Sequence, residues 1–153
     1  MNILFLHRNF PAQFRHLAPT LASDPNNKVV FITNNDTTRI NNILKVQYKL
    51  KREVPDNCHR YLRFYEECVI HGQSVAEAAI ALKEQGFKPD IIYGHTWGQT
   101  MFMKDVFPDV PLLCYFEWFY DRYNGDMGFD GKPLGIDDWA KLRSKNAHLL
   151  IDL

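Results

Sequence analysis

The stretch GFKPDIIYGHTWGQTMFMKDVFPDVPLLCYFEWFY, residues 86–120, decides the fold. Its apolar runs Ile91–Tyr93 and Pro111–Phe116 are short and continuous, which is typical of strands that are buried on both faces. Between them, Gly98–Phe107 is predicted to be a helix that stops at Pro108. A strand, a helix and a second strand in this order predict parallel strands joined by a crossover helix.

The same alternation continues toward the N-terminus. Ile3–Leu6 and Val29–Ile32 are two more continuous apolar runs and are predicted to be buried strands. Between them, residues spaced three and four apart form one helical face: Phe14, Leu17, Ala18 and Leu21. Pro19 falls inside this pattern and should kink or shorten the helix. Lys45–Lys51 alternates polar and apolar residues, which predicts a strand with one wet face near a sheet edge.

Two further helices complete the pattern. Residues 57–85 form one long helical pattern, which Gly72 could interrupt and which Gly86 should end. After a glycine-rich loop over residues 121–135, a last helix is predicted to open at Asp137 or Asp138 and to run to the chain end. Alternating strands and helices predict an α/β fold, a Rossmann-like three-layer α/β/α body with a mainly parallel sheet and strand order 3-2-1-4-5. A length of 153 residues fits a single domain over residues 1–153.

Composition argues against several classes of protein. The 18 Lys and Arg residues balance the 18 Asp and Glu residues, so nucleic acid is not an expected partner. The three cysteines form no CxxC pair and the N-terminus has no signal-peptide pattern, which together favour a reducing, cytoplasmic location. One basic cluster is interpreted as a solvated strand face that could also make peripheral contact with acidic lipid headgroups at the inner membrane face: Lys45, Lys49, Lys51 and Arg52.

Candidate site residues follow three of the predicted strands, because ligands of open parallel sheets bind outside the carboxyl ends of the strands. The first strand is followed by His7, Asn9 and Gln13, the fourth by His95, Trp97, Gly98 and Gln99, and the fifth by Glu117, Trp118, Tyr120 and Arg122. With the first and fourth strands adjacent, His7 and His95 are expected to line one crevice, and Glu117 lies one strand away. His95 and Glu117 are the candidate catalytic residues, and the others are candidate substrate-binding residues.

Each loop favours a different chemistry. Gly94 and Gly98 would let the backbone approach a ligand closely, and a helix beginning near Gly98 would point free N–H groups into the crevice as an anion site. His95 can take either protonation state near neutral pH, while Glu117 can accept from hydroxyls or act as a base. The aromatic faces in these loops could stack on sugar rings or bases.

The same residues also have structural interpretations. His7 could be a hydrogen-bonded group at a strand end, and Glu117 could pair with Arg122. Trp118 and Tyr120 could pack against the glycine-rich loop. The other histidines lie on helical patterns and are interpreted as surface or hydrogen-bonded residues: His16, His59, His71 and His148.

Motifs of other ligand-binding and hydrolytic folds are missing from the sequence. The first strand is not followed by GxGxxG, and neither GxxxxGK[ST] nor GxSxG occurs. His7, His95 and Glu117 have the two-His-one-carboxylate composition that a metal could use, although no HExxH spacing supports it. A metal-dependent hydrolase and a non-catalytic ligand-binding module therefore stay open as alternatives.

Four stretches resemble the N-terminal domain of family 4 glycosyltransferases of the GT-B fold: FLHRNFPAQFRHLAPTLA (residues 5–22), GQSVAEAA (72–79), the stretch 86–120 quoted above, and RSKNAHLL (143–150). The resemblance covers nearly the whole chain and is most specific between Pro89 and Tyr120. It implies two Rossmann-like domains with the active site between them. The N-terminal domain would bind the acceptor, and a C-terminal domain with an E-x7-E motif, missing from this chain, would bind the nucleotide-sugar donor. Retention of configuration, no metal, and contact between His95 and the transferred sugar are implied as well, with residues 7–13 facing the cleft.

The resemblance thus implies an enzyme that transfers a sugar from a nucleotide sugar to a carbohydrate or lipid-linked acceptor. The nucleotide sugar would be a co-substrate, and no other cofactor is expected. The chain would be the acceptor-side part of a longer two-domain enzyme and inactive by itself. Many relatives carry glycines in the first loop, whereas residues 7–13 contain none.

Overall fold

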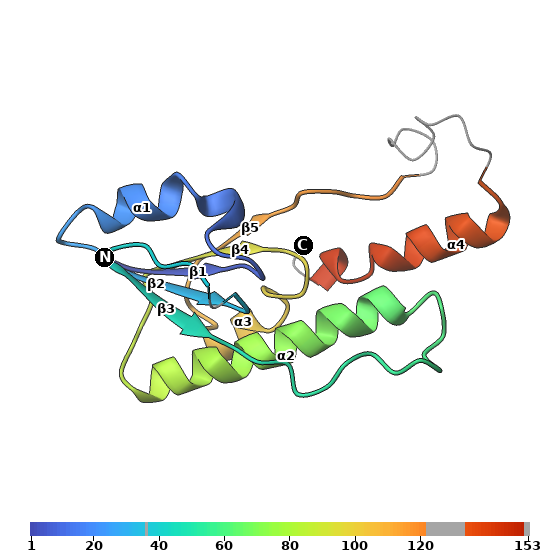
Figure 1. The fold of residues 1–153 in the computed structure, drawn as a ribbon, viewed down its shortest axis with the longest axis horizontal. Helices are drawn as coiled ribbons and strands as arrows, with labels where there is room; N and C mark the ends of the chain where they lie inside the picture. Colours follow the sequence, from blue (N-terminus) through green and yellow to red (C-terminus); the bar gives the residue numbers. More distant parts are fainter. Residues whose placement is uncertain (36, 122–133, 152–153) are drawn as a thin grey trace.

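The computed structural model describes residues 1–35, 37–121 and 134–151. Its centre is one sheet of five parallel strands in the order β3-β2-β1-β4-β5, which confirms the predicted strand order (Figure 1). The strands are β1 (Asn2–Leu6), β2 (Lys28–Thr33), β3 (Ile43–Gln47), β4 (Ile91–His95) and β5 (Leu112–Tyr115). The helical elements are η1 (Ala12–Phe14), α1 (Leu17–Ala22), α2 (Arg63–Glu84), α3 (Met103–Val106), α4 (Ile136–Lys145) and η3 (Leu149–Ile151).

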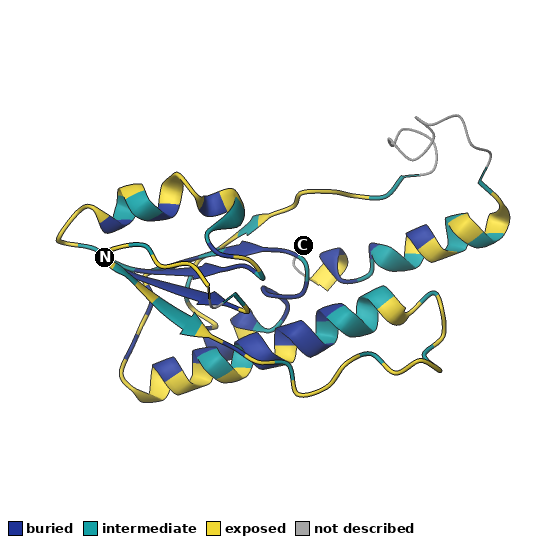
Figure 2. Cartoon of the chain, viewed as in Figure 1, coloured by how far each residue is buried: buried dark blue, intermediate teal, exposed yellow. Residues whose placement is uncertain are grey.

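Two apolar layers cover the sheet, and the alternation of β1 shows how they form. Leu4 and Leu6 pack into the layer beneath α2, whereas Ile3 and Phe5 pack into the layer beneath α1. All four are at most 2% exposed, and burying each such side chain contributes roughly 1.5–3 kcal/mol. The central strands are accordingly the most buried part of the molecule (Figure 2). Strands buried on both faces read as continuous apolar runs, which is why β1 and β2 could be predicted from the sequence.

The edge strand β3 begins and ends earlier than the predicted Lys45–Lys51. It ends at Gln47, and the next residue, Tyr48, is only 3% exposed and turns its hydroxyl toward His71 of α2. Lys51 and Arg52 then form ion pairs with Glu77 and Glu66 of the same helix. The chain leaves the sheet at this point because its side chains find partners on α2, so of the basic cluster only Lys45 lies on a strand.

The long helix α2 begins at Arg63 rather than at residue 57, and residues 55–62 form turns closed by backbone hydrogen bonds to Pro55 and His59. Gly72 does not interrupt the helix. A Cβ at Gly72 would lie 2.7 Å from the Gly98 carbonyl oxygen, so this glycine lets α2 pack closely against the loop after β4. Gly86 ends the helix as predicted, with φ +86° and the Phe87 N–H bonded to the Leu82 carbonyl at 2.9 Å.

The helix predicted over Gly98–Phe107 is much shorter than expected. Only Met103–Val106 is helical, and the residues before it form turns whose backbone lies against α2. Gly98 adopts φ +96°, and a Cβ there would lie 2.3 Å from the Cys68 carbonyl oxygen. The prediction of a helix N-terminus aimed into the crevice is therefore wrong, because the helix begins five residues later and has a single turn.

Of two predictions toward the ends of the chain, one is confirmed and the other needs correction. Helix α1 covers six residues, Leu17–Ala22, after a separate turn at η1, so the stretch around Pro19 is short as expected. The last helix begins at Ile136 and ends at Lys145 instead of running to the chain end, and η3 follows it. Residues 122–133, including Arg122 and most of the predicted glycine-rich loop, lie outside the described residues.

Candidate functional site

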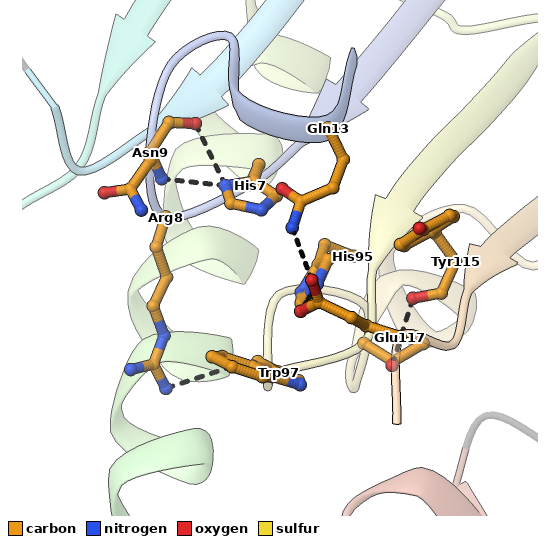
Figure 3. Close-up of polar contacts among 9 residues, drawn as sticks. His7, Arg8, Asn9, Gln13, His95, Trp97, Tyr115 and Glu117 are labelled. Carbon is orange, nitrogen blue, oxygen red and sulfur yellow. Dashed lines mark hydrogen bonds and ion pairs between the residues drawn. The ribbon is translucent and has the colours of Figure 1, made fainter. Parts of the chain in front are cut away.

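The structure brings His7, His95 and Glu117 together at the carboxyl ends of β1, β4 and β5 (Figure 3). The imidazole rings of His7 and His95 meet edge to face with centroids 4.6 Å apart. His95 Nε2 lies 3.1 Å from Glu117 Oε2, and the His95 side chain is 1% exposed whereas that of Glu117 is 34% exposed. The two imidazoles are therefore held inside the protein, while the carboxylate faces both the protein and the solvent.

Two residues of the loop after β1 fix the orientation of this group. The Gln13 amide donates to Glu117 Oε1 at 2.9 Å, so each carboxylate oxygen has one partner. His7 Nδ1 lies 2.8 Å from the Asn9 backbone nitrogen and 3.0 Å from the Asn9 carbonyl oxygen, so the Asn9 backbone fixes the orientation of the His7 ring. We refer to His7, Gln13, His95 and Glu117 as the His–Glu cluster. His7 Nε2 is buried, lies near the Gln13 amide, and has no hydrogen-bond partner of normal geometry among the described residues.

The protonation states of the cluster follow from burial and from these contacts. Burial, together with the neighbouring His95, lowers the pKa of His7 to about 4. Burial also lowers the pKa of His95, although its contact with Glu117 opposes the shift. Burial alone would raise the pKa of Glu117, but the hydrogen bonds from Gln13 and His95 outweigh it and leave that pKa lowered. At neutral pH the cluster therefore holds two neutral imidazoles and one carboxylate.

Arg8 is a site residue that the sequence analysis missed. Its guanidinium bonds Glu67 of α2 at 2.6 Å and the Trp97 carbonyl oxygen at 3.2 Å. It thus ties the end of β1 to α2 and to the loop after β4. The one available signal was its position directly beside His7, because a charge in a loop at the carboxyl end of a strand needs a partner there.

The aromatic candidates lie around the cluster at different depths. Trp97 meets His95 edge to face with ring centroids 5.1 Å apart, and the ring centroid of Phe64 of α2 lies 6.3 Å from that of Trp97. Trp118 is 38% exposed, with its ring centroid 6.4 Å from that of Tyr120. The Tyr120 backbone makes two hydrogen bonds to the Asn146 side chain, at 2.8 and 2.9 Å. Tyr120 is therefore anchored to the C-terminal segment, whereas Trp118 presents its ring to solvent.

Gly94, Gly98 and Gln99 are buried, and the structure assigns both glycines a packing role. A Cβ at Gly94 would lie 2.1 Å from a Thr100 methyl carbon, and Gly98 lies against Cys68 as described above. The close backbone approach predicted for these glycines is thus made to protein atoms. Gln99 is 0% exposed and its side chain lies near the Tyr48 hydroxyl, so it does not reach the surface beside His95.

Two histidines interpreted from the sequence as surface or hydrogen-bonded residues are buried close to the site. His71 is 5% exposed and its Nδ1 lies 2.7 Å from the Tyr48 hydroxyl, so it is hydrogen-bonded as expected. His148 is 2% exposed and packs against Phe64, and neither ring nitrogen has a partner of normal geometry among the described residues, although the Lys145 backbone is close. The prediction for His148 is therefore wrong. Its helical spacing was misleading, because α4 ends before it.

The described residues hold neither a cluster of metal ligands nor a helix suited to cross a membrane. No group of three or more His, Cys, Asp or Glu side chains in residues 1–35, 37–121 and 134–151 could hold a metal ion. His7 and His95 already direct one ring nitrogen each at protein groups, so the alternative of a metal site finds no support in their geometry. Within the same residues, no helix is both long enough and apolar enough to cross a bilayer.

Comparison with known proteins places the fold. A search of curated proteins found no match. The apo structure of UGT2 from Phytolacca americana is similar with a TM-score of 0.52 and 13% identity, over 75% of this chain and 29% of that chain. The same enzyme in complex with UDP-2fluoro-glucose and pterostilbene gives a TM-score of 0.50 and 12% identity, over 75% of this chain and 30% of that one. The present chain thus spans less than a third of the length of these GT-B glycosyltransferases, whose fold it shares.

The sequence itself provides the more specific match. The family model described as "Glycosyl transferase family 4 group" matches residues 25–153, which is most of the chain and includes the fourth and fifth strands with the loops that carry His95 and Glu117. The chain therefore belongs to the glycosyl transferase family 4 group.

Proposed function

We propose that this chain is the acceptor-side domain of a retaining glycosyltransferase that moves a sugar from a nucleotide sugar to a carbohydrate or lipid-linked acceptor. Family membership and the fold support glycosyl transfer in general. The observation that carries the more specific proposal is the His95–Glu117 contact of 3.1 Å at the carboxyl ends of adjacent strands. This is the edge at which open parallel sheets bind their ligands.

In this proposal the cluster recognises sugar hydroxyls. The Glu117 carboxylate is ionised and partly exposed, so it can accept hydrogen bonds from hydroxyl groups in addition to those it receives from Gln13 and His95. The neutral His95 ring donates to Glu117 and holds it in one orientation. His7 Nε2 is buried beside the Gln13 amide and has no hydrogen-bond partner of normal geometry among the described residues, so it is a further polar atom with which a ligand entering beside Gln13 could pair. Trp118 adds an exposed aromatic face on which a sugar ring can stack.

The donor-binding groups are proposed to come from a second domain. A leaving nucleoside diphosphate requires positioned donors that stabilise its developing charge. The chain spans 29% and 30% of the length of the two similar structures, which leaves room in a protein of their length for a second domain of comparable or larger size. Two domains facing each other across the His–Glu cluster would also exclude water from the reacting groups.

The proposal is tested by measuring sugar transfer from a panel of nucleotide sugars, with the 153-residue chain alone and with the complete enzyme that carries this domain. We expect transfer by the complete enzyme, no turnover by the isolated chain, and an unchanged anomeric configuration when the product is analysed by proton NMR. Robust transfer by the isolated chain would refute the assignment as an acceptor-side half. An inverted product would refute retention while leaving glycosyl transfer intact.

A non-catalytic ligand-binding module is the second candidate, and one observation favours it. Both Glu117 oxygens already have protein partners, as expected for a cluster with a structural role. The partial exposure of Glu117 and the unpaired His7 Nε2 favour the enzyme instead. The two candidates differ in the result for the complete enzyme, because a binding module would bind sugars in a calorimetric titration without consuming any nucleotide sugar.

A further inference from the structure

A hollow of about 450 Å³ lies between the start of α2, the turns that precede it and the helix α4. Four cationic side chains line it, namely Arg60, Arg63, Lys141 and Lys145, against the two carboxylates Asp56 and Glu67. The chain as a whole has a formal net charge of zero, so this excess of positive charge is local. An excess of cations around an open hollow favours an anionic ligand.

The contacts of these residues leave the two lysines available. Glu67 is engaged by Arg8 at 2.6 Å, Arg60 pairs with Asp137, and Arg63 lies 3.6 Å from Asp56. Lys141 makes no ion pair or hydrogen bond with the described residues. Lys145 lies four residues later on α4, one turn further along the same face of the helix.

Lys145 is held in place without having its charge neutralised. Its ammonium lies 5.3 Å from the centre of the Phe64 ring and 4.9 Å from that of Tyr120. Contacts with aromatic faces orient a cation but add no opposing unit charge. Lys145 therefore stays electrostatically available to a ligand in the hollow.

The hollow adjoins the His–Glu cluster. Phe64 lines the hollow and lies 6.3 Å from Trp97, which in turn contacts His95. Glu67 also lines the hollow and is bonded to Arg8, whose other nitrogen bonds the Trp97 carbonyl oxygen. A molecule whose hydroxyl reaches Glu117 could thus extend a charged group past Trp97 toward Lys141 and Lys145.

We propose that this hollow is a subsite for a phosphate monoester carried by the acceptor, with Lys141 and Lys145 as its principal binding groups. A phosphate monoester carries close to two negative charges at neutral pH and three acceptor oxygens, which suits two unneutralised ammonium groups with a guanidinium nearby. The identity of the ligand as an acceptor rests on the proposed function, whereas the binding of phosphate does not. Both a soluble sugar phosphate and a lipid phosphate carry this group.

The test compares two sources of the same phosphate chemistry on the 153-residue chain. Glucose 6-phosphate, glucose and glucuronate are titrated by isothermal calorimetry, and vesicles of phosphatidylcholine with or without phosphatidic acid are assayed by co-sedimentation. The test variant is Lys141→Gln/Lys145→Gln, and Lys28→Gln/Lys88→Gln, which removes two exposed lysines outside both the hollow and the basic cluster, is the matched control. Because Lys145 contacts two rings, Lys141→Arg/Lys145→Arg is included to restore charge, and circular dichroism checks the fold of each variant.

We expect glucose 6-phosphate or phosphatidic acid vesicles to bind, with affinity reduced about five- to tenfold in the Gln variant and retained in the Arg and control variants. Added salt should weaken the same binding. Whichever source binds identifies the acceptor class. Binding of neither, equal loss in the control, or equal binding of glucose would overturn the phosphate subsite, and tighter binding of glucuronate would replace it with a carboxylate subsite. Phosphate binding by a protein that transfers no sugar would instead contradict the proposed function alone.

Discussion

At the scale of single residues, the buried ring of His95 contacts the partly exposed carboxylate of Glu117. Its ring is neutral because burial lowers its pKa, and its contact with Glu117 keeps that carboxylate oriented. In the complete enzyme, His95→Ala should lower kcat about 100-fold or more, the usual scale for removing one positioned group. The exposed His16, replaced by Ala in the same way, is the control. A change in kcat of less than twofold for His95→Ala would remove this residue from the site.

Gln13 acts on the same carboxylate from the other side. Its amide hydrogen bond is among the contacts that lower the pKa of Glu117, so Gln13→Ala should raise that pKa. If activity requires ionised Glu117, the acid limb of the pH–rate profile moves to higher pH and kcat near neutral pH changes less than in His95→Ala. The profiles of wild type, Gln13→Ala and the control Arg15→Ala, which alters an exposed neighbour in the same loop, are compared in the complete enzyme. An acid limb that stays in place would show that Gln13 does not tune Glu117.

The residues that sequence reasoning could identify are those whose place follows from topology alone. His7, His95 and Glu117 each follow a strand, and the order of parallel strands brings strand ends together. Arg8 and His148 could not be placed in this way, because their surroundings depend on how α2 and the C-terminal segment pack across the loops. Long-range packing of this kind leaves no periodic signal in the sequence.

At the scale of elements, the contact between α2 and the loop after β4 depends on Gly72 and Gly98, which leave no room for a side chain. Gly98→Ala should be strongly destabilising, roughly 3 kcal/mol or more, because φ is +96° and the new Cβ would lie 2.3 Å from the Cys68 carbonyl oxygen. Gly86→Ala is the matched control, since φ is +86° there but no atom lies within 4 Å of the new Cβ, so only the backbone strain of about 1–2 kcal/mol is expected. Urea unfolding measures the free energy of unfolding of both variants. Equal losses would show that the close approach of α2 does not restrict the residue at position 98.

The same contact explains which elements the sequence could not predict. Strands β1 and β2 lie within one residue of their predicted bounds, because buried parallel strands are marked by apolar runs, whereas β4 ends two residues after the predicted Tyr93. The segment before Met103 has the apolar residues of a helix, yet its backbone turns against Cys68 and Gly72 instead. Helix α2 was placed too early because its periodicity extends into turns that precede Arg63 and no capping side chain marks its start.

At the scale of the whole molecule, four histidines are buried close to the carboxyl ends of the strands and beside α2: His7, His71, His95 and His148. Their rings come from the residue after β1, from α2, from β4 and from the segment after α4, so the packing of these elements keeps all four away from water. Burial lowers the pKa of each, to about 4 for both His7 and His71. Protonating any of these rings would place a charge among several packed elements, which is unfavourable in the folded state.

The molecule should consequently lose stability in mild acid. Between the ordinary histidine pKa of 6.5 and a folded-state pKa of about 4, the unfolded chain binds more protons than the folded one, so the free energy of unfolding falls as pH falls through this window. The loss between pH 7 and pH 5 should be about 1–2 kcal/mol for each of His7 and His71, as measured by urea unfolding at the two pH values. His71→Gln, which can still accept a hydrogen bond from Tyr48, should reduce the pH dependence even if it lowers stability at pH 7, whereas His16→Gln serves as the exposed control. A free energy of unfolding that is equal at pH 7 and pH 5 would show that these imidazoles gain access to water or to a counter-charge when they are protonated.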